Sequence, residues 1–473
     1  MWRRRRAEVV ASNGVSEPVV SLTRASKSTL YCSRRAEERP PERVIQISLN
    51  AEAHPPSPDP VEKEAAMEVL YPRSGGLDVH KDEVVACVRV AAGSEVRREI
   101  RRFSTTTRGL QRLAEWLREQ AVTHVAMEST GVYWKPVWHM LEGTFALTLG
   151  NAKEMRNVPG RKTDQNDASW IADLQAHGLI RPSFVPATPI QELRDLTRLR
   201  KQLTRERSQH VQRIQKVLED ANLKLSSVLT DIMGLSGRDI LDAIVRGEED
   251  PQRLAELAQP RVKATKAAIA EALTGRVREH HRYLLRLHLG HINVLDGTLE
   301  SLEGRIEEKL EPFRAKRERL CGIAGVKETV AGVILAETGG EMKAFPTEDH
   351  LVAWAGLAPG QDESAGKRRN TRTKPQRWLK GAMVQAAHAA VKKKDSYLRV
   401  KYMRIRARQG GKKAIVAVAA TLLRVAYVML RDGVEYRDLG ADYVDPNNRD
   451  RAARRMRRRL EKMGYEVELR MAA

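Results

Sequence analysis

Residues 75–177 alternate short apolar runs with amphipathic segments, and this pattern constrains the fold more than any other feature of the chain. Two apolar runs around a turn at Lys81 and Asp82 predict paired strands, and the run EIRRFSTT predicts a third strand. Two further strands are predicted at HVAMES and FALTLGN, and helices are predicted over 108–120, 132–142 and 167–177. This order is typical of a mixed sheet covered by helices, an α/β fold.

Four acidic residues occupy informative positions in this pattern. Asp78 and Glu128 each interrupt an apolar strand, where an unpaired charge would be costly. Asp164 and Asp167 lie three residues apart at the predicted start of the last helix, and residues with this spacing share a helix face. If the first and fourth strands are neighbours, Asp78 and Glu128 lie side by side and face that helix. Turn, surface and helix-capping roles are the alternatives.

The four carboxylates predict a metal site, because carboxylates that converge repel one another unless a cation lies between them. A hard divalent ion, most often Mg²⁺, is the usual occupant of a site with oxygen ligands. Two such ions would stabilise both the attacking and the leaving oxygen of a phosphodiester displacement. Arg161 and Lys162 precede the aspartate pair and suit a phosphate backbone that approaches the metal.

The formal net charge of +22 indicates a polyanionic partner, and nucleic acid is the partner that it favours. Residues 366–413 contain 17 Lys or Arg against one acid, Asp395, whereas a solvated surface normally mixes both signs. Trp378, Tyr397 and Tyr402 lie among these cations and would either stack on bases or belong to the core. The candidate phosphate contacts are Lys367, Arg368, Arg369, Arg372, Lys374, Arg377, Lys380, Lys412 and Lys413.

Two long runs, 190–218 and 262–310, carry leucine, isoleucine and valine every three to four residues among dense charges. This spacing predicts two long amphipathic helices that pair as a coiled coil, with turn signals in the linking residues 233–260. The pair would be either an intramolecular helical hairpin or a contact between protomers.

Residues 320–340 place the glycine-containing motif G-I-A-G-V between two helical segments, as in helix-hairpin-helix DNA-binding proteins. Glycines there would either expose backbone N–H groups to a phosphate or allow two helices to pack closely.

The two ends of the chain differ from the middle. Residues 1–67 are basic and rich in Pro and Ser without apolar periodicity, so we expect a disordered extension. The tail from 436 onward is predicted to be a basic helix. The most apolar window, 415–430, contains Arg424 and is too short to span a bilayer, and no secretory signal is evident. We therefore expect a cytoplasmic protein without a membrane partner.

The chain has three cysteines, Cys32, Cys87 and Cys321, which lie far apart and form no C-x-x-C pair. This spacing excludes a disulfide framework and a cysteine-based zinc site.

The stretches GLDVHKD, AMESTGVYW and GRKTDQNDA resemble the N-terminal domain of IS110-type transposases, and residues 320–426, which contain S-A-G-K, resemble their C-terminal domain. The resemblance implies a ribonuclease-H-like domain similar to the resolvase RuvC, in which Asp78, Glu128, Asp164 and Asp167 form a DEDD set that binds Mg²⁺. It also implies that Ser364 attacks a DNA phosphate and holds a phosphoserine intermediate. Lys367 and Arg368 would then steady the developing charge.

The resemblance also implies partners and a domain order. A structured noncoding RNA would specify target and donor DNA, and several protomers would form a composite site from the acids of one chain and the serine of another. The expected parts are a disordered extension (1–67), a RuvC-like domain (75–185), a coiled-coil region (190–315), a mainly helical C-terminal transposase domain (320–435) and a basic tail (436–473).

We therefore expect a DNA transposase that cleaves and rejoins strands. Two alternatives stay open at this stage. One is a metal-dependent RuvC-like endonuclease whose C-terminal half only holds DNA. The other is a noncatalytic nucleic-acid-binding protein.

Overall fold

The computed structural model describes residues 68–93, 95–129, 131–158, 166–359, 363–364, 367–368, 377–440, 454 and 456–468. The predicted disordered extension lies outside these residues. So do Arg161, Lys162, Asp164, Arg369, Arg372 and Lys374. For Ser364, Lys367, Arg368 and Arg377 only the backbone is described.

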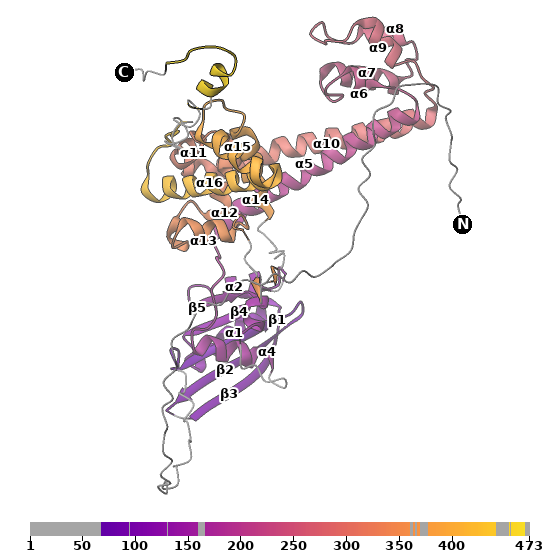
Figure 1. Ribbon diagram of the computed structural model, residues 1–473. Coiled ribbons are helices and arrows are strands. Elements are labelled where there is room, and N and C mark those ends of the chain that lie inside the picture. The colour runs from indigo at the N-terminus through magenta and orange to yellow at the C-terminus, as the bar shows by residue number, and fades with distance from the viewer. Residues whose placement is uncertain are drawn as a thin grey trace, which may run out of the picture. The chain divides into compact units, whose positions relative to one another are not determined.

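Five strands form a mixed sheet in the order β3-β2-β1-β4-β5 (Figure 1). The strands β1, β2 and β3 form an antiparallel meander, and β1, β4 and β5 run parallel to one another. This arrangement confirms the predicted mixed sheet, including the adjacency of the first and fourth strands, and it fits a ribonuclease-H-like fold. The strand bounds are Arg73–Val79 (β1), Glu83–Ala92 (β2), Glu95–Ser104 (β3), His124–Glu128 (β4) and Ala146–Gly150 (β5).

Both faces of the central strands are apolar, and helices cover both. The face that carries Leu77 and Met127 packs against α1 (Thr107–Glu119) and α2 (Trp134–Leu141). The opposite face, which carries Val85, Cys87 and Ala126, is covered by α4 (Asp167–Ala176). A short helix, α3 (Ala152–Arg156), precedes α4.

The backbone of α4 touches β1 at Gly76. A Cβ atom at this glycine would lie 2.2 Å from the Ala168 carbonyl oxygen and 2.3 Å from the Ala172 nitrogen. Two residues earlier in the strand, the Ser74 hydroxyl donates to the Ala172 carbonyl (3.2 Å). Near the start of β1, Leu70 donates its N–H to the carbonyl of Ala176. The helix therefore runs antiparallel to β1, and its N-terminus lies at the end of β1.

An ion cluster also ties α4 to the sheet. Asp173 of α4 accepts hydrogen bonds from Arg89 of β2 and Arg98 of β3, with 2.9 Å from its Oδ1 to Nε of Arg89 and to Nη2 of Arg98. The Arg89 side chain is 4% exposed, so Asp173 neutralises a buried charge.

Two long helices, α5 (Thr188–Asp220) and α10 (Glu279–Leu310), pack against each other within the chain (Figure 1). Ion pairs join Glu192 to Lys309 near one end and Asp220 to Arg278 at the other, so the helices are antiparallel. This geometry is the predicted intramolecular hairpin, whereas the contact between protomers stays a prediction.

The prediction that the second long helix begins near residue 262 was wrong. The chain at Gly275 passes close to the end of α5, where a Cβ atom would lie 2.4 Å from the Ala221 carbonyl oxygen, so no continuous helix fits. The residues before α10 instead form short helices. These helices pack together with parts of α5 and α10 around one hydrophobic core. These helices are α6 (Leu225–Val228), α7 (Leu235–Arg246), α8 (Pro251–Glu256) and α9 (Lys266–Ala272).

The remaining helices pack around a third core, to which α5 and α10 contribute Leu193 and Leu302. The last helix of this core, α16 (Gly411–Asp432), is long and apolar enough to cross a membrane by length and composition alone. This differs from the expectation that the apolar window 415–430 is too short. Its apolar window is 67% buried, as in a core helix. The helices are α11 (Arg314–Cys321), α12 (Glu328–Thr338), α13 (Glu348–Trp354), α14 (Arg377–Ala390), α15 (Tyr397–Gln409) and α16 (Gly411–Asp432), with 3-10 turns η1 (Glu311–Phe313) and η2 (Met342–Ala344).

The G-I-A-G-V motif connects α11 to α12, as predicted. Gly325 has a φ of +84°, and a Cβ atom there would lie 2.4 Å from the Ala386 carbonyl oxygen of α14. Close packing of helices therefore requires this glycine, which supports the packing alternative for the motif.

We predict that Gly76→Ala destabilises the sheet and α4, because the new methyl group would overlap the helix backbone. Overpacking of this kind costs about 1–3 kcal/mol or more. Hydrogen–deuterium exchange of peptides from β1 and α4 should accelerate. Gly290→Ala is the control, since open space surrounds that position of α10. This control should leave hydrogen–deuterium exchange unchanged or slow it, because alanine is more favourable than glycine in a helix by about 1 kcal/mol. Equal behaviour of the two variants would contradict the close contact.

We also predict that the alkylation rate of Cys87 measures how tightly α4 packs on the sheet. Burial raises the pKa of the Cys87 thiol, so it stays protonated and reacts slowly with iodoacetamide at mildly alkaline pH. Asp173→Asn should speed its alkylation at least about tenfold, because removing one partner of a buried ion pair costs about 3–5 kcal/mol. The control is Asp242→Asn, which removes a partly exposed pair with Arg238 and should change little. Peptide mass spectrometry would measure both rates, and equal rates would exclude this role for Asp173.

Candidate functional site

Asp78 and Glu128 lie on the same face of the sheet, at the ends of neighbouring parallel strands. The last paired residues of β1 and β4 are Leu77 and Met127, and the next residue of each strand is one of the two acids. Asp78 pairs in the antiparallel direction with Val85, which packs against α4. Because side chains alternate along a strand, Glu128 shares a face with Ala126, which also packs against α4. Both acids are therefore on the face that α4 covers.

Asp167 is the first residue of α4 and is exposed. Since α4 runs antiparallel to β1, this residue lies at the same end of the sheet as Asp78. The helix cap is Asn166, whose side chain accepts from the Ala168 N–H at 2.9 Å. Asp164 precedes this cap and lies outside the described residues. The described helix begins at Asp167, and the expectation that both aspartates share one helix face stays a prediction.

The chemistry of these acids fits a divalent metal ion, since all are hard oxygen donors. Among the described residues, no group of three or more potential ligands is close enough to hold an ion. Carboxylates without a cation between them repel one another, and one member of the predicted set is outside the described residues. Asp78, Glu128 and Asp167 would hold the metal together with Asp164.

His80 contacts Asp78 directly. Its Nε2 lies 3.1 Å from Oδ2 of Asp78, and the imidazole is more than half exposed at the turn between β1 and β2. This contact places an imidazole within hydrogen-bond distance of a carboxylate of the candidate site.

Ser364 lies in a two-stranded hairpin. The strand β6 (Glu363–Ser364) pairs antiparallel with β7 (Lys367–Arg368), and Ser364 is the backbone partner of Lys367. The candidate nucleophile and the adjacent cations therefore lie at the turn of one hairpin.

The described members of the predicted basic surface differ in their settings. Lys412 and Lys413 are exposed in the first turn of α16. Lys380 is half-buried and donates to the Gly356 carbonyl at 2.8 Å, so it has a role within the fold. Tyr397 and Tyr402 pack against the helical core, which supports the core alternative for both.

A buried charge cluster was not predicted. Glu337 of α12 is fully buried and accepts two hydrogen bonds of 2.8 Å from Arg198 of α5. Arg194 donates to the Glu337 backbone carbonyl at 2.6 Å, and burial lowers its pKa to about 10, which leaves it charged at neutral pH. No local pattern marks such a cluster, because its members are some 140 residues apart in the chain.

Comparisons with known proteins agree with the sequence resemblance. A family model of DEDD transposases of the IS110 type matches residues 75–223, and a model of the IS116/IS110/IS902 transposase family matches residues 317–403. The first match contains Asp78, Glu128 and Asp167, and the second contains Ser364.

Two proteins encoded by insertion elements are also similar. The 42 kDa protein of IS900 from Mycobacterium paratuberculosis is 26% identical over 328 residues, which cover 62% of this chain and 80% of the relative. The 43.6 kDa protein of IS110 from Streptomyces coelicolor is 36% identical over 142 residues, which cover 29% of this chain and 34% of the relative. The chain therefore belongs to the IS110 family and is a transposase.

Proposed function

We propose that this transposase moves an insertion element by cleaving and rejoining DNA strands, with metal bound by Asp78, Glu128, Asp164 and Asp167 and with Ser364 as the nucleophile. What supports the proposal is that Asp78 and Glu128 end neighbouring strands on the face covered by α4, and that Asp167 begins α4 at the same end of the sheet. Mg²⁺ is the proposed metal because its ligands are oxygens. When bound, it supplies positive charge for the phosphate that reacts.

The serine step conserves the number of phosphoester bonds. The Ser364 oxygen would attack the phosphorus and form a phosphoserine, while the bond to one deoxyribose oxygen breaks and that oxygen leaves as a hydroxyl. The serine proton ends on the departing oxygen. Attack by a hydroxyl of another strand then releases the serine and rejoins the DNA.

The proposed partners are element and target DNA, a noncoding guide RNA and further copies of the chain. The formal net charge of +22 supports polyanionic partners such as DNA and RNA. The proposed functional parts are the RuvC-like domain (75–185), the helical region (190–315) and the C-terminal domain (320–435), in a cytoplasmic protein.

We predict that strand cleavage depends on divalent metal and on each acid of the set. Alanine at Asp78, Glu128, Asp164 or Asp167 should reduce cleavage about a hundredfold or more, since a catalytic metal stabilises the transition state by several kcal/mol. The assay is excision of the native element, with its flanking DNA and any RNA that it encodes, in a bacterial host and with purified protein plus or minus chelator. Glu83→Ala, on an exposed residue that pairs with Arg102, is the control.

We predict that a covalent protein–DNA adduct forms and that Ser364→Ala abolishes it. Labelled element-end DNA should co-migrate with the protein on a denaturing gel for the native chain. Ser301→Ala, at an exposed position of α10, should retain the adduct.

The two alternatives give different results in these assays. If the chain were only a metal-dependent endonuclease, Ser364→Ala would keep cleavage while Asp78→Ala would lose it. If it were a noncatalytic binding protein, both variants would match the native chain in every assay.

A further inference from the structure

A basic pocket lies between α5, α12 and α14, in a part of the molecule that the proposed chemistry does not use. Its volume is about 400 Å³, within the range of small-ligand sites. Trp378 of α14 lines it, and the Arg198 guanidinium lies 5.8 Å from the centre of the indole ring. Ala382 and Val333 add an apolar wall, and Gln385 adds an amide.

The cation of Arg198 is held in place. Two of its three guanidinium nitrogens, Nε and Nη2, donate to the buried carboxylate of Glu337, which restrains the side chain beside Trp378. The pocket thus has a rigid planar cation next to an aromatic ring, and both types of surface stack on nucleobases.

Two lysines supply unpaired positive charge to the same pocket. Lys201 and Lys327 line it and are exposed, and neither forms an ion pair with a described residue. Lys327 is also the N-cap residue of α12. The pocket therefore combines flat apolar and aromatic walls with cations at its margin, which suits a base with its phosphate.

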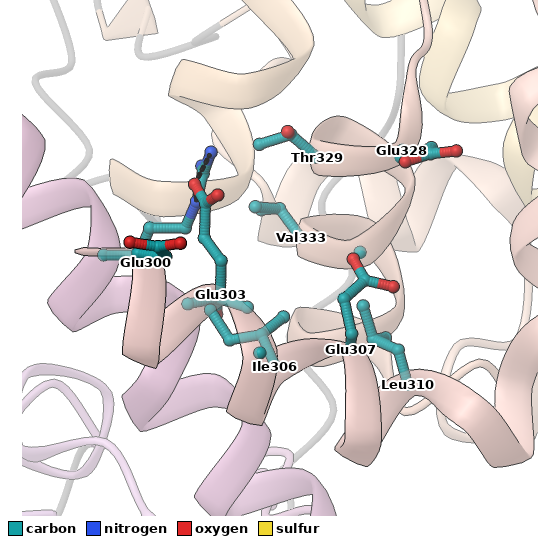
Figure 2. Close-up of a pocket in the computed structure, with 12 residues that line it drawn as sticks. Glu300, Glu303, Ile306, Glu307, Leu310, Glu328, Thr329 and Val333 are labelled. Carbon is teal, nitrogen blue, oxygen red and sulfur yellow. Dashed lines mark hydrogen bonds and ion pairs between the residues drawn. The ribbon is translucent and has the colours of Figure 1, made fainter. Parts of the chain in front are cut away.

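A neighbouring pocket has the opposite charge. It lies between α5, α10 and α12, and its walls carry Glu300, Glu303, Glu307 and Glu328 (Figure 2). Arg200 borders both pockets and pairs with Glu303 at 2.9 Å. Arg317 pairs with both Glu307 and Glu328, so this acidic wall is partly neutralised.

We propose that the pocket of Trp378, Arg198, Lys201 and Lys327 binds one unstacked nucleotide of a single-stranded nucleic acid. The base packs against Trp378 and Arg198, and the phosphate contacts the two lysines. This inference rests on the proposed function only in taking nucleic acid as the partner. A base within a duplex cannot enter a concave pocket, so the site selects single strands or flipped-out bases.

The test uses the full-length chain in chelator, so that no cleavage contributes. Fluorescence anisotropy would measure affinity for labelled oligothymidylate, labelled oligouridylate and a blunt DNA duplex. Lys201→Glu and Lys327→Glu should each weaken single-strand binding about tenfold or more, and Trp378→Ala about tenfold. The thymidylate and uridylate arms distinguish DNA from RNA as the source of the nucleotide.

Matched controls separate the pocket from general charge. Lys216→Glu makes the same charge change at an exposed position of α5, about 22 Å from Lys201 at 1.5 Å per residue. It should reduce binding only about twofold or threefold. Trp378→Phe should retain most of the affinity, because it keeps an aromatic face. If Trp378→Ala does not fold, the Trp378→Phe variant tests the aromatic contact in its place. Duplex affinity should fall equally for Lys201→Glu and Lys216→Glu.

Photocrosslinking locates the base. Oligothymidylate that carries 5-iodouracil should crosslink to the peptide that contains Trp378. A crosslink outside the pocket, or equal single-strand affinities for Lys201→Glu and Lys216→Glu, would overturn the proposal. Failure of the proposed chemistry would instead appear as cleavage that survives Asp78→Ala or Ser364→Ala, with these binding results unchanged.

Discussion

The contact between the backbone of α4 and Gly76 of β1 is the constraint on which the acidic site depends. A side chain at Gly76 would lift the helix, and the buried charge of Arg89 requires Asp173 of that helix. These two contacts hold the helix over the sheet, so that its first residue, Asp167, lies at the same end of the sheet as Asp78. If α4 no longer packed on β1, the acids would still be present in the sequence but would not lie at the same end of the sheet.

The sequence predicted most of this domain because its signals are local. Apolar runs and helical periodicity located the strands and helices between 73 and 176, and the charges in two strands singled out Asp78 and Glu128. The role of Gly76 and the pairing of Asp173 with Arg89 involve residues about 85–95 apart, which no periodicity can show. The start of α10 was missed for the same reason, since the chain near Gly275 contacts the end of α5, which lies more than 50 residues earlier in the sequence.

Residue type alone also left alternatives that only packing decides. Gly325 allows two helices to pack closely, which is one of the two roles predicted for its motif, and Tyr397 and Tyr402 pack against the core. Trp378 has the same kind of sequence environment, yet it lines a basic pocket. An aromatic residue among lysines and arginines therefore predicts a base contact only when its ring borders a cavity.

The distribution of ion pairs matters more for recognition than the net charge. Glu337 neutralises buried arginine, and the half-buried Arg200 and Arg207 of α5 pair with Glu303 and Asp296 of α10. A cation that is already paired gains little from a phosphate, because it must give up one anion to meet another. Lys201 and Lys327 form no ion pair with the described residues, and they border a pocket beside a wall of glutamates. Because these two lysines are not already paired, they gain more from a phosphate than the paired arginines of α5 do.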